Sequence, residues 1–167
     1  MSNLITKVAT AAAIAGASGM AAQPSYSQDA SMDIAEFQRC LEVADADDNI
    51  NRNECIGVAS SKCIGTYYSA SGKANCWSME TKLWDGMLNH EYRELNKSSS
   101  NRKFKSALKT TQRAWIKYRD ADCGLFGAMG IGGAPEEQLF ENCNMNHTAK
   151  RANALQELGQ IVRQVEN

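Results

Sequence analysis

The side chains best suited to chemistry in this chain are its six cysteines. A cysteine can bind a metal, attack a substrate or pair with a second cysteine in a disulfide. Zinc sites usually use C-x-x-C pairs or a cysteine and histidine constellation, whereas 14, 7, 12, 46 and 19 residues separate these cysteines. The even number and the spacing therefore favour three disulfides over a metal site. The six residues are Cys40, Cys55, Cys63, Cys76, Cys123 and Cys143.

A helix predicted over residues 54–64 restricts how these cysteines pair. Cys55 and Cys63 lie near its two ends, about 12 Å apart at 1.5 Å per residue, and a disulfide needs α-carbons within about 7 Å. They cannot bridge each other if this helix is continuous. Antiparallel helical hairpins would instead join neighbours along the chain. We predict the pairs Cys40–Cys55, Cys63–Cys76 and Cys123–Cys143.

The other groups that could support catalysis do not form a recognisable site. His90 and His147 are the only histidines, and both fall on predicted polar helix faces. His90 is followed by a glutamate, but the second histidine of the H-E-x-x-H zinc motif is missing. Glu80, Glu91 and Glu94 could supply a carboxylate pair for glycoside chemistry, although helical surfaces often carry such pairs. We predict no enzyme activity, no catalytic residue, no metal and no cofactor.

An acidic stretch at residues 45–53 alternates Asp and Asn as calcium loops do. Counted from Asp45, the sixth position holds Ile50 where such a loop needs glycine, and the twelfth holds Ile56 where it needs a bidentate glutamate. A solvated turn is therefore the better interpretation. Its carboxylates are available to a protein partner, and the candidate residues are Asp45, Asp47 and Asp48.

Residues 124–134 combine five glycines with four sizeable apolar side chains. A phosphate-binding loop would need a preceding strand, a following helix and the Lys and Ser/Thr of a P-loop, and this context is absent. We expect a loop instead, and two interpretations stay open. It covers the core, or it protrudes and inserts into the cleft of a partner protein. The candidate contact residues in the second case are Phe126, Met129 and Ile131.

The N-terminal residues have the pattern of a secretory signal peptide. Lys7 precedes an alanine-rich apolar run, and small residues follow up to Ala22. This run is too short for a membrane span, which needs about 20 apolar residues. The first cysteine, Cys40, lies too far downstream for a lipoprotein. We therefore predict a signal peptide at 1–22, a flexible segment at 23–31 and a soluble periplasmic or secreted protein.

The rest of the chain is predicted to be all-α. Apolar residues recur at helical spacing, no alternating strand pattern appears, and short polar connections favour antiparallel neighbours. We predict a disulfide-stapled bundle of about five helices within one domain, 32–167. With 17 basic and 19 acidic residues after the signal, nucleic acid is an unsuitable partner. The helices are expected at about 32–44, 54–64, 74–96, 101–122 and 135–165.

The fourth predicted helix carries a stripe of bulky side chains. Phe104, Leu108, Thr111, Trp115, Tyr118 and Asp122 follow one another at spacings of four, three, four, three and four residues. Trp115 and Tyr118 would each bury about 150–250 Å² in a core. Arg119 lies one turn beyond Trp115, where it can stack on the indole or pair with a carboxylate across a helix contact.

Three ordered motifs together resemble the LprI-type lysozyme inhibitor N-terminal domain family. They are Trp84-Asp85-x-x-Leu88-Asn89-x-x-Tyr92, Gln112-Arg113-Ala114-Trp115-x-x-Tyr118-Arg119-Asp120-x-x-Cys123, and Thr148-x-x-Arg151-x-x-x-Leu155. The resemblance extends from about Cys40 to Leu158. The residues that match the family pattern are Trp84, Asn89, Tyr92, Gln112, Trp115, Tyr118, Arg119, Asp120 and Arg151.

The resemblance implies a secreted or periplasmic bacterial helical domain, with one named member that inhibits lysozyme. It supplies no catalytic residues. We expect Arg119 and Arg151 to tie helices together through carboxylates such as Asp120, Asp122 or Glu80. Two functions stay open at this point: a protein-binding module that inhibits lysozyme, and a non-catalytic envelope structural or assembly factor with another protein target.

Overall fold

The computed structural model describes residues 32–47, 49–66 and 69–166. Within these ranges the chain is helical and has no strand, as predicted. The elements are α1 (Ile34–Ala46), the 3-10 helix η1 (Arg52–Cys55), α2 (Val58–Thr66), α3 (Ala70–Ser98), α4 (Arg102–Ala128) and α5 (Gly133–Glu166). The predicted signal peptide, the segment 23–31 and Asp48 lie outside the described residues. None of the described helices is long and apolar enough to cross a membrane.

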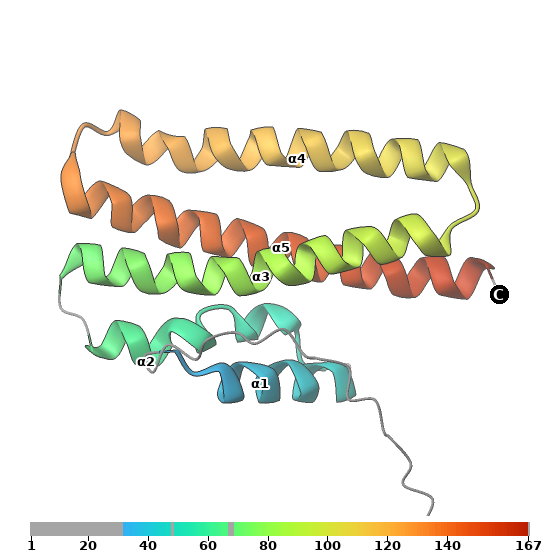
Figure 1. The fold of residues 1–167 in the computed structure, drawn as a ribbon, viewed down its shortest axis with the longest axis horizontal. Helices are drawn as coiled ribbons and strands as arrows, with labels where there is room; N and C mark the ends of the chain where they lie inside the picture. The colour runs from blue at the N-terminus through green and yellow to red at the C-terminus, as the bar shows by residue number, and fades with distance from the viewer. Residues whose placement is uncertain (1–31, 48, 67–68, 167) are drawn as a thin grey trace, which may run out of the picture.

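The helices form three layers (Figure 1). In the middle layer α3 and α5 lie side by side and make the most extensive contact in the fold. On one side α4 packs on α5, and on the other side α1, η1 and α2 form the opposite edge. Helices that follow one another among α3, α4 and α5 are antiparallel, as predicted. Because α4 returns the chain between them, α3 and α5 run parallel to each other.

The core lies between α3, α5 and α1. On α3, Trp84, Leu88 and Leu95 face inward at helical spacing. Phe37 of α1 meets Trp84 edge to face, with ring centroids 4.9 Å apart. The small residues of α5 in this contact let the two long helices approach closely. The buried residues of α5 in the core cluster are Met145, Ala149, Ala152, Leu155 and Val162.

The disulfide pairing predicted from the sequence is confirmed. The α-carbon separations of the three pairs are 5.7, 5.8 and 5.6 Å, within the usual range for disulfides. They join α1 to η1, α2 to α3, and α4 to α5, so each links two consecutive helices. The pairs are Cys40–Cys55, Cys63–Cys76 and Cys123–Cys143.

The prediction of one continuous helix over residues 54–64 is wrong. The chain forms η1, turns at Ile56 and Gly57, and restarts as α2. Gly57 has a φ of +92°, which favours glycine because it lacks a β-carbon. The turn directs the backbone N–H of Gly57 toward the Oε1 of Glu80 on α3 at 2.7 Å, and the N–H of Ser60 toward Oε2 at 2.8 Å.

The prediction of a loop over residues 124–134 is also wrong. Helix α4 continues through Ala128 and α5 begins at Gly133, so only a short turn separates them. A glycine inside a helix costs only about 1 kcal/mol relative to alanine, which the neighbouring Cys123–Cys143 disulfide and helix packing can offset. The turn uses the two glycines at 130 and 132, which have φ values of +70° and +69°.

The stripe predicted on α4 is only partly buried. Leu108 is buried, and Phe104 and Trp115 pack partly against the core. Tyr118 is 57% exposed, so the expectation that it enters the core is wrong. The buried face of α4 is instead rotated toward Gln112 and Cys123, because α4 contacts mainly one helix, α5.

We predict that Glu80→Gln lowers the free energy of unfolding by about 3 kcal/mol, because an amide NH₂ would face donors that now meet a carboxyl oxygen. Glu80 is fully buried and accepts three hydrogen bonds, the third from the indole N–H of Trp84 at 2.9 Å. Urea unfolding followed by circular dichroism measures the change. Glu42→Gln on exposed α1 is the control and should leave the midpoint unchanged; equal midpoints for both variants would contradict the prediction.

Candidate functional site

Four of the residues that match the family pattern converge where α4 meets α5. The side chain of Arg151 on α5 donates from Nε to the Oε1 of Gln112 on α4 at 2.9 Å. Its guanidinium also lies 6.0 Å from the centroid of Trp115, and the guanidinium of Arg119 lies 5.1 Å from the same ring. Trp115 therefore contacts two cations at distances typical of cation–π interactions. We call Gln112, Trp115, Arg119 and Arg151 the Trp115 cluster.

Each arginine matches only part of the prediction that they join helices through carboxylates. Arg119 pairs with Asp120, its neighbour on the same helix, at 2.7 Å, so this ion pair does not join helices. Arg151 does join helices, but through the amide of Gln112 instead of a carboxylate. Burial lowers the pKa of Arg151 from its ordinary value, which is the expected cost of placing a guanidinium against an indole away from water.

The remaining matched residues do not form part of this cluster. Trp84 is buried in the core and Tyr92 packs partly against it. Asn89 donates to Asp85 at 2.8 Å on the outer face of α3. Most of the matched residues therefore have structural contacts that account for them.

The prediction that His147 lies on a polar surface is wrong, because its ring is partly buried between α4 and α5. Its Nε2 lies 2.7 Å from the Oδ2 of Asp122 on α4, and its ring meets Tyr118 edge to face at 5.3 Å. Within the described residues, its ring and the sulfurs of Cys123 and Cys143 have the spacing of metal ligands. Both sulfurs are in a disulfide, so they are not thiolates and leave only the imidazole as a ligand. His90 is on the surface, as predicted.

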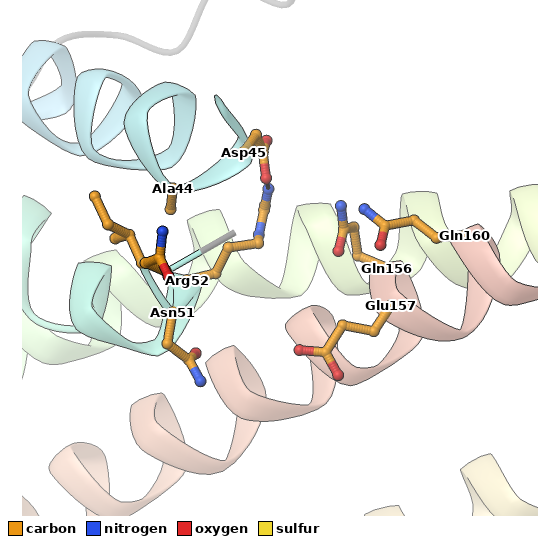
Figure 2. Close-up of a pocket in the computed structure, with 9 residues that line it drawn as sticks. Ala44, Asp45, Asn51, Arg52, Gln156, Glu157 and Gln160 are labelled. Carbon is orange, nitrogen blue, oxygen red and sulfur yellow. Dashed lines mark hydrogen bonds and ion pairs between the residues drawn. The ribbon is translucent and has the colours of Figure 1, made fainter. Parts of the chain in front are cut away.

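A second candidate site is a polar cleft between the α1–η1 edge and the C-terminal half of α5 (Figure 2). Its volume is about 380 Å³. Asp45 and Arg52 form an ion pair on one side, and Gln156, Glu157 and Gln160 line the other side from α5. The complete lining is Ala44, Asp45, Asn49, Ile50, Asn51, Arg52, Gln156, Glu157 and Gln160.

Hydrogen bonds to α5 hold Arg52, one of the lining residues, in place. Arg52 donates from Nε to the Oδ1 of Asn153 at 3.2 Å, and Asn153 donates to the Oδ1 of Asn53 at 2.9 Å. Asn153 is buried, so these bonds are protected from water. The α1–η1 edge is therefore attached to α5 by specific polar contacts.

Asp47 lies beside the cleft and is held in an acceptor role. The backbone N–H of Asn49 donates to its Oδ1 at 2.9 Å, and the side-chain amide of Asn49 donates to the same atom at 2.8 Å. These two hydrogen bonds lower the pKa of Asp47, because they favour the charged form. The carboxylate therefore stays negative at all neutral and mildly acidic pH values.

The apolar partner-binding candidates are far from the acidic ones. Met129 is 62% exposed and Ile131 is 49% exposed in the turn between α4 and α5, while Phe126 is half-buried. This turn lies at one end of the long helices, on the other side of the α3–α5 layer from α1 (Figure 1). We therefore expect a single partner protein to contact either the acidic candidates or the apolar candidates, and not both.

Sequence reasoning missed the α5 side of the cleft. Gln156 and Glu157 are adjacent and Gln160 lies about one turn further along the helix, and a polar patch at that spacing indicates a solvated face. No local sequence pattern shows that this face of α5 meets residues about a hundred positions earlier in the chain. The hydrogen bond between Arg52 and Asn153 is one such contact.

We predict that Gln112 and Arg151 are energetically coupled by about 1 kcal/mol, the usual contribution of one part-buried hydrogen bond. The test is a double-mutant cycle with Gln112→Ala, Arg151→Ala and the double variant, using urea unfolding. The control cycle uses Arg119 and Asp120, an ion pair with one side chain well exposed, where coupling should be too small to measure. Coupling equal in both cycles would contradict the assigned role of the Gln112 contact.

Two comparisons with known proteins found sequences similar to this chain. The model of the lysozyme inhibitor LprI family matches residues 63–155, from the end of α2 to the middle of α5. Over 52 residues the chain is 48% identical to an uncharacterized protein of Rhizobium meliloti (strain 1021), a match that spans 31% of this chain and 37% of that protein. No solved structure matches significantly. Because the family match covers more than half of the chain, the chain belongs to the LprI lysozyme inhibitor family.

Proposed function

We propose that this protein is exported and inhibits lysozyme by binding it through an acidic edge, without catalysis. The acidic edge is α1, the turn that follows it, and η1. The observation that carries the proposal is its charge. Residues 32–57 contain seven acidic and two basic side chains, a net charge of −5, and they border the polar cleft of Figure 2. A basic enzyme such as lysozyme would be attracted to this edge.

The cleft suits a cationic side chain of the partner. Asp45 and Glu157 supply two carboxylates, against the single cation Arg52. Four amide side chains, those of Asn49, Asn51, Gln156 and Gln160, add carbonyl oxygens as acceptors. A guanidinium or ammonium group from the enzyme would find several acceptors at once, and charge-assisted hydrogen bonds of this kind are the stronger ones.

The acidic edge is also preorganised. The Cys40–Cys55 disulfide joins α1 to η1, and Arg52 and Asn53 are hydrogen-bonded to Asn153 of α5. A surface held in place before binding loses less conformational entropy when the partner arrives. We expect inhibition to require the intact disulfide for this reason.

The turn between α4 and α5 is a less suitable contact for a basic enzyme. It follows α4, in which residues 102–128 contain seven basic and two acidic side chains, a net charge of +5. Like charges repel a basic partner before it docks. Membership of the LprI family supports lysozyme as the target, while charge supports the acidic edge as the contact.

We predict that the oxidised protein slows lysis of a cell-wall suspension by lysozyme, measured as turbidity, and that the reduced and alkylated protein does not. Asp47→Asn combined with Glu157→Gln removes two negative charges beside the cleft and should weaken inhibition about tenfold, because close opposite charges across an interface add to affinity.

The matched control is Asp85→Asn combined with Glu137→Gln, which changes the net charge equally at sites on α3 and α5 outside the cleft. It should inhibit as the unmodified protein does. Equal inhibition by both double variants would exclude the acidic edge as the contact. Absence of inhibition by the unmodified protein would favour the role of an envelope assembly factor with another protein target.

A further inference from the structure

The outward face of α4 is a continuous basic surface. Residues 102–117 contain six basic side chains and no acidic one. At 100° per residue, all six fall within an arc of about 160° around the helix, and they extend over about 22 Å of its length. Leu108 and Trp115 face the other way, toward the bundle. We call this surface the basic face; its residues are Arg102, Lys103, Lys105, Lys109, Arg113 and Lys117.

The fold does not use these charges. Within the described ranges none of the six forms an ion pair, and five of the six are exposed, with Lys105 partly so. Lys105, Lys109, Arg113 and Lys117 follow one another every four residues, and like charges at this spacing destabilise a helix. A chain that keeps such a row without an internal counter-charge has a surface suited to an anionic partner.

The shape of the basic face selects an extended partner. α4 is the outermost helix on its side of the bundle (Figure 1), so the surface is convex. The clefts around α1, η1, α3 and α5, and the one at the α4–α5 turn, include none of the six cations. On a convex surface a small anion meets few of the six cations at once, whereas a broad anionic surface could meet several of them together.

Exposed apolar side chains continue the same helix. Leu125 and Met129 are each 62% exposed, and Ile131 is 49% exposed in the turn beyond α4. Tyr118, 57% exposed, precedes these residues along α4 and contacts the ring of His147 on α5. A linear polyanion or an acidic protein surface would account for the cations but not for the exposed apolar side chains. Cations beside exposed apolar and aromatic residues are the combination that adsorbs to lipid headgroups and reaches the acyl boundary.

We propose that α4 binds the surface of a bilayer that contains anionic phospholipids, with the basic face against the headgroups and the α4–α5 turn at the acyl boundary. The acidic edge lies on the opposite side of the α3–α5 layer (Figure 1), so it faces away from the bilayer and stays open to a protein. This inference rests on α4 and the turn that follows it, and it does not depend on lysozyme as a target.

The test is cosedimentation of the full, oxidised protein with vesicles of phosphatidylcholine, with and without phosphatidylglycerol. Binding is expected only with phosphatidylglycerol and should fall as salt rises, because mobile ions screen exposed charges. The variant Lys109→Glu, Arg113→Glu, Lys117→Glu should bind at least about tenfold more weakly, since each cation near an anionic surface contributes to adsorption. Leu125→Ser with Met129→Ser should weaken binding about threefold and not abolish it.

The matched control is Lys62→Glu, Lys73→Glu, Lys82→Glu, which makes the same change in net charge on α2 and α3. It should keep vesicle binding within about twofold of the unmodified protein. Equal loss in both triple variants, or equal binding to neutral vesicles, would overturn the proposal. Binding to soluble polyphosphate without binding to vesicles would overturn it too, and would assign the basic face to a linear polyanion. Circular dichroism checks that each variant is folded. The α4 variants are also assayed for lysozyme inhibition, which they should keep, so that failure of lipid binding is distinguished from failure of the proposed function.

Discussion

The position of the N-terminal layer depends on one buried carboxyl group. Both oxygens of Glu80 are used, by the backbone N–H groups of Gly57 and Ser60 and by the indole of Trp84. A buried carboxyl group is tolerated only where its oxygens are hydrogen-bonded, so the turn at Gly57 and the Trp84 core must form together. The disulfides Cys40–Cys55 and Cys63–Cys76 flank this point on either side along the chain. Glu80 therefore places the N-terminal layer on α3, and the contacts of Phe37 with Trp84 and of Arg52 with Asn153 extend that attachment to α1 and the acidic edge.

The fold separates charge across its layers. The α1–η1 edge carries a net charge of −5 over residues 32–57, and α4 carries +5 over residues 102–128. The α3–α5 layer lies between them. The nearly neutral chain therefore presents two surfaces of opposite character. Overall net charge hides this, because the two contributions cancel.

The sequence predicts the local parts of this structure well. Helix-period stripes and cysteine spacing were sufficient for the all-α class, the inward face of α3 with Trp84, and all three disulfides. The errors arise where long-range packing decides. The glycines after Cys123 indicate a loop on propensity alone, yet contact with α5 keeps them helical to Ala128.

The candidate site was less predictable than the fold. Asp45, which lines the cleft, belongs to an Asp-rich turn that is a local pattern and so could be singled out from the sequence. The cleft itself could not, because it exists only where residues near position 50 meet residues near position 155. The contact between Arg151 and Gln112 is of the same kind, since 39 positions separate the two residues. The predicted carboxylate partners were chosen by charge, and charge alone does not say which groups meet.

The weak burial of α4 explains what the Trp115 cluster does. Only Leu108 and Cys123 are buried among its 27 residues, so hydrophobic burial alone holds this helix loosely. Three contacts hold α4 on α5 at different points along its length. The Cys123–Cys143 disulfide lies near one end, and the contact of His147 with Asp122 lies beside it. In the middle of α4, Arg151 contacts Gln112 and Trp115. The family-pattern residues at this interface thus position α4, and they leave its outer face free to vary in charge without loss of the fold. The basic face and the proposed lipid contact lie on that free surface.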